Sequence, residues 1–144
     1  MKAYSTQTVY HEYSGKIRSD DVGEEKRIEN SIKRYVEENL NCWLLKIQGG
    51  ANSKTTGVPD IFFGYRGYVI FVEVKTPNGV LSKVQKYQIQ DLRKKGNIAI
   101  VASDLKTVQE VIKHINYLQD DKLMFRNKSI INSCNEMGWN VDDT

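Results

Sequence analysis

The sequence is poor in the residues that build several common kinds of site. It contains only two cysteines, two histidines and two prolines in 144 residues. Cys42 and Cys134 do not form a Cys-x-x-Cys pair, so we expect two reduced, partly buried thiols rather than a structural zinc site. His11 and His114 lack the neighbouring residues that a Ser-His-Asp triad requires. Any chemistry of this chain therefore has to rest on other side chains.

Long hydrophobic runs are also missing. The longest apolar runs, such as residues 68–72, are far too short to cross a bilayer. Residues 1–16 contain no apolar signal-peptide core. Hydrophobic residues make up 40% of the chain and charged residues 27%, which is ordinary for one globular domain. We therefore expect a cytoplasmic protein with no membrane partner.

Charge of one sign is concentrated in the middle of the chain. The formal net charge is +3, but residues 23–116 alone carry 15 basic and 10 acidic side chains, a net charge of +5. Residues 1–22 are balanced, and residues 117–144 carry a net charge of −2. A basic middle segment favours a polyanionic partner, although a charge of this size is weak evidence by itself.

Hydrophobic periodicity predicts the order α-β-β-β-α-β-α. Apolar residues at three- and four-residue steps predict helices at 24–40, 82–96 and 105–115, and short apolar runs predict strands at 42–47, 60–63, 68–75 and 98–102. A helix connects the third strand to the fourth, so these two strands should be parallel neighbours. The pattern predicts an α/β domain with a mixed sheet flanked by helices at 23–118, a polar arm at 1–22 and a C-terminal tail at 119–144.

Charged residues follow the apolar part of the third predicted strand. Glu73 and Lys75 are two residues apart, so they point to the same face of the strand. Asp60 begins the neighbouring strand, and an antiparallel hairpin brings the start of one strand beside the end of the other. Ionised groups at the end of a buried strand are costly unless they are paired or bind a cation. The sequence therefore predicts that Asp60, Glu73 and Lys75 lie close together.

Two carboxylates beside an ammonium group match what phosphodiester hydrolysis requires. Carboxylate oxygens bind Mg²⁺, which activates a water and offsets the charge of the phosphate. The lysine can orient that water or stabilise the developing oxyanion. A carboxylate of the first helix could complete the metal shell. Glu25 and Glu29 are one turn apart and both could face the sheet edge; we favour Glu29.

Several motifs together resemble a known family. They are Gly57-Val-Pro-Asp60, Glu73-Val-Lys75, Gly79-x-x-Ser82-x-x-Gln85 and the Gly96 turn before the run IAIVAS. Their joint spacing is similar to that of the virus-type replication-repair nuclease (VRR-NUC) domain of the PD-(D/E)xK nuclease superfamily. The resemblance covers about residues 24–115, and it implies a restriction-endonuclease-like core.

The resemblance also implies an activity and a set of site residues. The implied catalytic residues are Asp60, Glu73, Lys75 and Gln85. The implied metal ligands are Glu29, Asp60, Glu73 and Val74, for Mg²⁺ with Mn²⁺ as a substitute. We expect a Mg²⁺-dependent DNA endonuclease acting on branched DNA such as four-way (Holliday) junctions. A homodimer is expected because one small chain has one active site, and a bacterial or phage origin is suggested by the family.

Some residues have two interpretations. Gln85 could act in the site, which the resemblance favours, or complete a capping box with Ser82. Lys46, Lys54, Lys83 and Lys86 are candidate phosphate contacts, although a solvated lysine is the more common arrangement. For the whole protein, the alternatives are a nucleic-acid-binding module that does not cleave and a nuclease acting on single-stranded or flap substrates.

Overall fold

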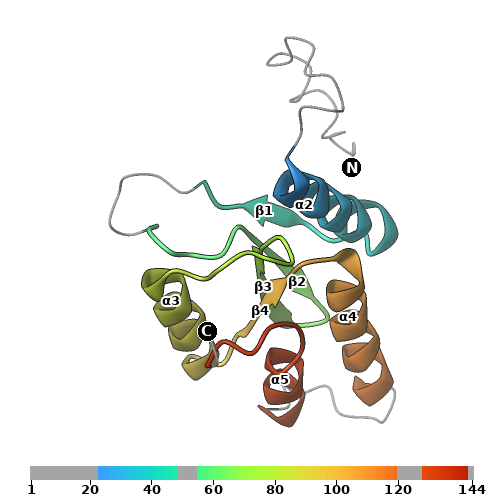
Figure 1. Cartoon of the computed structure of the whole chain (residues 1–144). Coiled ribbons are helices and arrows are strands. Elements are labelled where there is room, and N and C mark those ends of the chain that lie inside the picture. Colours follow the sequence, from blue (N-terminus) through green and yellow to red (C-terminus); the bar gives the residue numbers. More distant parts are fainter. Residues whose placement is uncertain (1–22, 49–54, 120–127, 143–144) are drawn as a thin grey trace.

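The computed structural model describes residues 23–48, 55–119 and 128–142, and its elements follow the expected order (Figure 1). The predicted arm at 1–22 and the candidate DNA contact Lys54 lie outside the described residues. The elements are α2 (Glu24–Arg34), η2 (Tyr35–Asn39), β1 (Leu44–Lys46), β2 (Ile61–Tyr65), β3 (Tyr68–Val74), α3 (Lys83–Lys94), β4 (Ile98–Ala102), α4 (Leu105–Gln119) and α5 (Lys128–Asn135). The last helix, α5, lies within the predicted tail.

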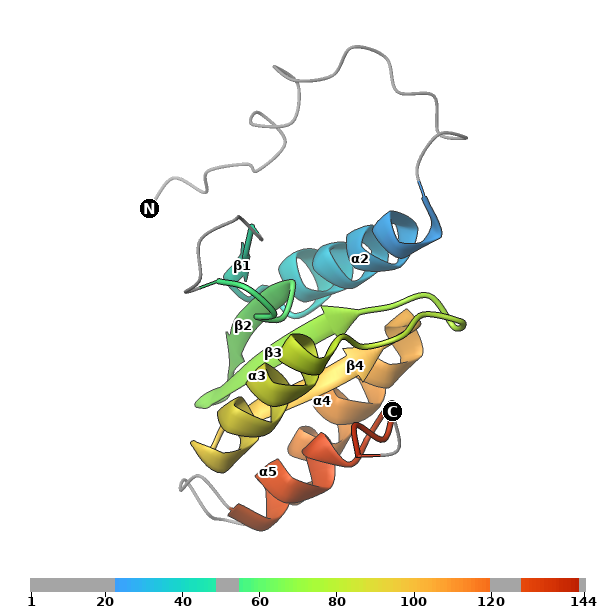
Figure 2. The same ribbon diagram turned by 60° about the vertical axis from the view of Figure 1, so that its left-hand side comes forward.

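The four strands form one mixed sheet in the order β1-β2-β3-β4. The pairs β1/β2 and β2/β3 are antiparallel, and β3/β4 is parallel, which confirms the predicted crossover through a helix. Helices α2 and α4 cover one face and α3 covers the other (Figure 2). Every residue of β4 is buried, as is typical of a strand with helices on both faces.

A two-residue turn fixes the register of the β2/β3 hairpin. Arg66 and Gly67 have φ values of 48° and 86°, and two consecutive positive φ values are characteristic of a type I′ turn. Tyr65 therefore pairs with Tyr68, and the ladder continues to Ile61 opposite Val72. One step further along this ladder, Asp60 comes beside Glu73.

The first helix differs from the continuous α-helix predicted for residues 24–40. It is α-helical to Arg34 and then continues as a π-helix, in which the Leu40 N–H donates to the Tyr35 carbonyl at 3.1 Å. The wider turn keeps Val36 fully buried while Tyr35 and Leu40 pack against the core. Hydrophobic spacing does not predict this change, because a π-helix of five residues is too short for its different period to be recognised.

The described part of the C-terminal tail belongs to the core. Ile130, Ile131 and Val141 are buried, and the Asn135 side chain accepts from the Ala99 N–H and donates to the Asn97 carbonyl. Cys134 is also buried there. Both cysteines are free, as expected. The apolar residues of this segment show no strong period, because its contacts come from a short helix and single residues.

The helices of the described ranges are all too short or too polar to cross a bilayer.

Candidate active site

The acidic and basic residues singled out in the sequence meet at the carboxyl end of β3. Asp60 Oδ2 accepts a hydrogen bond of 2.8 Å from the backbone N–H of Val74. Lys75 Nζ lies 3.4 Å from Glu73 Oε1. The backbone N–H of Lys75 donates to the Ala102 carbonyl, so the strand is held against β4 up to the lysine itself. The structure thus brings Asp60, Glu73 and Lys75 together.

Gln85 combines the two interpretations that the sequence left open. Its Oε1 accepts from the backbone N–H of Ser82 at 2.9 Å. The backbone N–H of Gln85 donates to the Ser82 hydroxyl, which completes the capping box of α3. Its Nε2 donates to Glu73 Oε1 at 2.5 Å. Since one amide group serves both partners, the start of α3 fixes the orientation of the Glu73 carboxylate.

Glu73 is the most strongly perturbed carboxyl of this cluster. The residue is only 2% exposed. Burial raises the pKa of the Glu73 carboxyl to about 8, the charge of Asp60 adds to the rise, and Lys75 opposes it. A raised pKa of this kind is common where several ionisable groups converge in a functional site.

Because the pKa of Glu73 is raised, the free energy of unfolding should fall as the pH rises. The folded state holds this proton more tightly than the unfolded state, so the stabilisation is fully present below pH 4.5 and is lost as the pH rises through about 8. The slope within this window is at most about 1.4 kcal/mol per pH unit. Glu73→Gln stays neutral, so its melting temperature in EDTA should gain several degrees on that of the wild type between pH 5.5 and pH 9. A difference that stays constant over this range would contradict the raised pKa.

Asp60 lies among other negative charges. Burial raises the pKa of the Asp60 carboxyl, and the carboxylates of Glu29 and Glu25 raise it further, while the Val74 N–H and Lys75 lower it. The helix α2 therefore presents both of its candidate acids to this end of the sheet, as expected from their spacing.

The two helix acids have different partners. Glu29 is buried, and Lys46 Nζ contacts both of its oxygens at 2.8 and 3.0 Å. Lys26 Nζ also reaches Glu29 Oε1 at 2.9 Å. Burial by itself raises the pKa of Glu29, but these hydrogen bonds outweigh it and the pKa is lowered. The side chain of Glu25 is 52% exposed and lies 3.9 Å from Lys75 Nζ.

The ligand role predicted for Glu29 beside Asp60 and Glu73 stays a prediction. Within residues 23–48, 55–119 and 128–142, no three acidic, histidine or cysteine side chains converge closely enough to hold a metal ion. Both oxygens of Glu29 are engaged by lysine. By contrast, Asp60 Oδ1 and Glu73 Oε2 have no hydrogen-bond partner in the described part of the chain. These two hard oxygen donors fit a divalent cation such as Mg²⁺, and Val74 can add only its backbone carbonyl.

The remaining candidate DNA contacts lie in different surroundings. Lys46 is paired with Glu29, and its side chain is 36% exposed. Lys83 is exposed in the first turn of α3. Lys86 Nζ donates to the carbonyl of Asp142 at 3.4 Å, so it contacts the C-terminal segment. A role of these lysines in DNA binding stays a prediction.

The sequence reasoning missed two residues of the cluster, Lys26 and Lys33. Both form ion pairs with Glu29, at 2.9 and 3.8 Å. Their signal was present in the sequence, because they stand three residues before and four residues after Glu29 on one helix face. The spacing becomes informative only once Glu29 is known to be buried.

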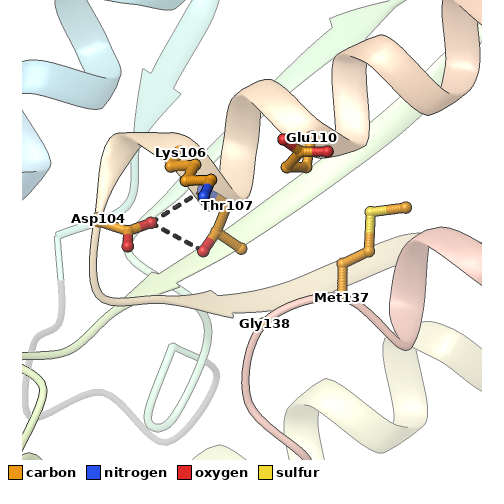
Figure 3. A pocket seen from close by; sticks show the side chains of 6 residues that line it. All are labelled: Asp104, Lys106, Thr107, Glu110, Met137 and Gly138. Carbon is orange, nitrogen blue, oxygen red and sulfur yellow. Dashed lines mark hydrogen bonds between the residues drawn. The ribbon is translucent and has the colours of Figure 1, made fainter.

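A separate cavity of about 320 Å³ lies at the start of α4 (Figure 3). Asp104 there accepts from the N–H and the hydroxyl of Thr107, both at 2.9 Å, so its carboxylate caps the helix. Gly138 lines the same cavity with a φ of 78°, and a Cβ atom would meet the Val101 carbonyl oxygen at 2.4 Å. None of the predicted site residues lines this cavity, and we assign it no catalytic role.

Comparison with known proteins gives one match. The model of the VRR-NUC domain matches residues 11–103, more than half of the chain and the whole segment from Glu25 to Gln85 that holds the cluster. No curated protein and no solved structure matches the chain. The four-stranded mixed sheet flanked by helices is consistent with the restriction-endonuclease-like fold of that family. The chain belongs to the VRR-NUC domain family, a family of nucleases.

Proposed function

We propose that the protein is a Mg²⁺-dependent DNA endonuclease that acts on branched DNA such as four-way junctions. The observation that carries this proposal is the convergence of Asp60, Glu73 and Lys75 at the end of β3, with Gln85 bonded to Glu73. The net positive charge of residues 23–116 supports a polyanionic substrate.

The cation would be held by Asp60 and Glu73, with the Val74 carbonyl as a further oxygen donor. Glu29, the ligand predicted from α2, would join them by exchanging a lysine contact for the cation. When bound, such an ion supplies an activated water and offsets charge on the phosphate. Glu73 has to lose its proton to serve as a ligand, and its raised pKa makes cation binding weaker at low pH. Mn²⁺ should substitute for Mg²⁺ because it accepts the same oxygen ligands.

Lys75 and Gln85 would prepare the site for the reaction. The Lys75 ammonium group, 3.4 Å from Glu73, would orient the attacking water or stabilise the developing oxyanion. Gln85 holds one oxygen of Glu73 and leaves the other open. Preorganised donors of this kind lower the barrier because they need not reorient during the reaction.

A homodimer is part of the proposal. Each chain contributes one such cluster, and cutting both strands of a junction requires two. Light scattering under cleavage conditions should therefore give twice the mass of the chain, which is 16.6 kDa. A strict monomer that still cuts both strands would contradict the dimer.

The function is tested by cleavage of a labelled four-way junction beside duplex, flap and single-stranded DNA. We expect cutting of the junction with Mg²⁺ or Mn²⁺ and none with EDTA. Cutting of only another substrate would retain the metal-dependent nuclease and reject the junction preference. Binding of DNA with no cutting of any substrate would instead identify a non-cleaving binding module.

A further inference from the structure

The carboxylate of Glu29 is surrounded by more positive charge than is needed to neutralise it. Lys26, Lys33 and Lys46 all form ion pairs with this single carboxylate, at 2.9, 3.8 and 2.8 Å. One hydrogen-bonded cation is enough to compensate a buried carboxylate. The group of four side chains therefore has a net charge of +2.

Two of the three lysines are open to solvent. The side chain of Lys26 is 44% exposed and that of Lys46 is 36% exposed, whereas Lys33 is 10% exposed and Glu29 8%. Lys26 Nζ and Lys46 Nζ bond the same Oε1 at 2.9 and 2.8 Å, so these two nitrogens lie at most 5.7 Å apart. Glu29 thus holds the ammonium groups of two partly exposed side chains close together in spite of their mutual repulsion.

The pair lies next to the candidate active site. Lys46 ends β1, and the following N–H of Ile47 donates to the Asp60 carbonyl at 2.7 Å. Lys26 comes from α2, the helix whose Glu25 lies 3.9 Å from Lys75 Nζ. The pair therefore borders the carboxylates Asp60 and Glu73 on the side of β1 and α2.

We propose that Lys26 and Lys46, held by Glu29, form a subsite for a backbone phosphate of the DNA next to the one that is cleaved. This inference rests on the proposed function, because it takes DNA as the ligand. The two non-bridging oxygens of a phosphodiester can accept from both ammonium groups at once. Glu29 is then a positioning residue for the two lysines, and the subsite gives affinity and register without reading sequence.

The test measures binding without cleavage. Full-length protein is titrated in EDTA into a fluorescein-labelled four-way junction and a duplex, and anisotropy is followed at several NaCl concentrations. Lys26→Met and Lys46→Met should each weaken binding several-fold, and the double variant, which leaves the phosphate with neither ammonium group, should lower the slope of log K against log salt by about one. The double variant should lose less than the product of the two single effects, because both lysines act on one phosphate.

Lys95→Met is the matched control. Lys95 also forms an ion pair within one helix, with Asp91 at 2.6 Å, but it lies at the other end of α3 from Gln85. Its removal costs the same unit of charge, and its salt slope should stay close to that of the wild type. Circular dichroism would verify folding; Lys26, which is half-exposed on a helix, keeps the test informative if Lys46→Met does not fold.

The outcomes separate the subsite from the nuclease. A salt slope for the double variant that equals the slope of Lys95→Met would overturn the subsite, even if the wild type cleaves junctions. Fully multiplicative losses in the double variant would overturn the sharing of one phosphate. The expected slopes in a protein that cleaves nothing would support the subsite while rejecting the nuclease. A wild type that binds neither DNA would overturn both.

Discussion

Substitution of Lys75 by methionine is expected to lower the rate of DNA cleavage by a factor of about 10²–10³ or more, the usual cost of removing an electrostatic stabiliser of a transition state. In the described part of the chain, no other cation forms an ion pair with Glu73. The neighbouring lysines are bonded to Glu29 instead. No described side chain is therefore placed to replace the Lys75 ammonium group.

Single-turnover cleavage of the junction with Mg²⁺ measures this effect. Lys75→Met should fold normally, because the ladder bond to Ala102 uses its backbone N–H and not its side chain. Asp60→Ala and Glu73→Ala should also lose activity, since each removes a carboxylate of the site. A fully active Lys75→Met or Glu73→Ala protein, with wild-type thermal unfolding, would reject this site as the centre of cleavage.

Deletion of residues 120–144 is expected to abolish stable folding. It would expose core positions that Ile130, Ile131 and Val141 now cover, and the loss of three such side chains costs roughly 5 kcal/mol. The loss of Asn135 would leave the Ala99 N–H without its 2.6 Å hydrogen bond, at a further cost of about 1–3 kcal/mol. Together these losses approach the total stability of a typical domain, about 5–15 kcal/mol.

Far-UV circular dichroism with thermal unfolding is the measurement for this deletion. Asn135→Ala in the full-length chain is the control, because it removes the two hydrogen bonds of this side chain and keeps the apolar cover. The point variant should melt cooperatively at a lower temperature, and the deletion should show no cooperative transition. A truncated protein that melts like the wild type would assign the C-terminal segment no role in stability.

The central part of the site was predictable because it depends on local rules. A tight turn at Gly67 fixes a hairpin, and an antiparallel hairpin places Asp60 beside Glu73 whatever side chains surround them. The same rules gave the parallel pairing of β3 with β4. The surroundings of these residues depend on longer-range packing.

Three features of the structure could not be predicted from the sequence. The direction of Lys46 follows from the pleat of a strand of only three residues, too short for an alternating pattern to be recognised. Nothing in the sequence indicates that Asn135 is buried, because a single asparagine looks the same in the sequence whether it lies in the core or on the surface. The sequence presents the capping contact and the site contact of Gln85 as alternatives. Both form together, because its side-chain amide accepts from Ser82 with its oxygen and donates to Glu73 with its nitrogen.

The contacts of Asn135 have a consequence for contact between molecules. β4 is the last strand of the sheet, and its sequence, Ile98-Ala-Ile-Val-Ala102, is uncharged and rich in β-branched residues. An open strand of this kind readily pairs with its counterpart in another copy. The amide of Asn135 and the N–H of Trp139, which donates to the Val101 carbonyl at 3.4 Å, occupy hydrogen-bonding groups of this strand. A proteolytic cut in the C-terminal segment would thus free backbone hydrogen-bonding groups at the β4 edge, and the cut protein would self-associate through this strand.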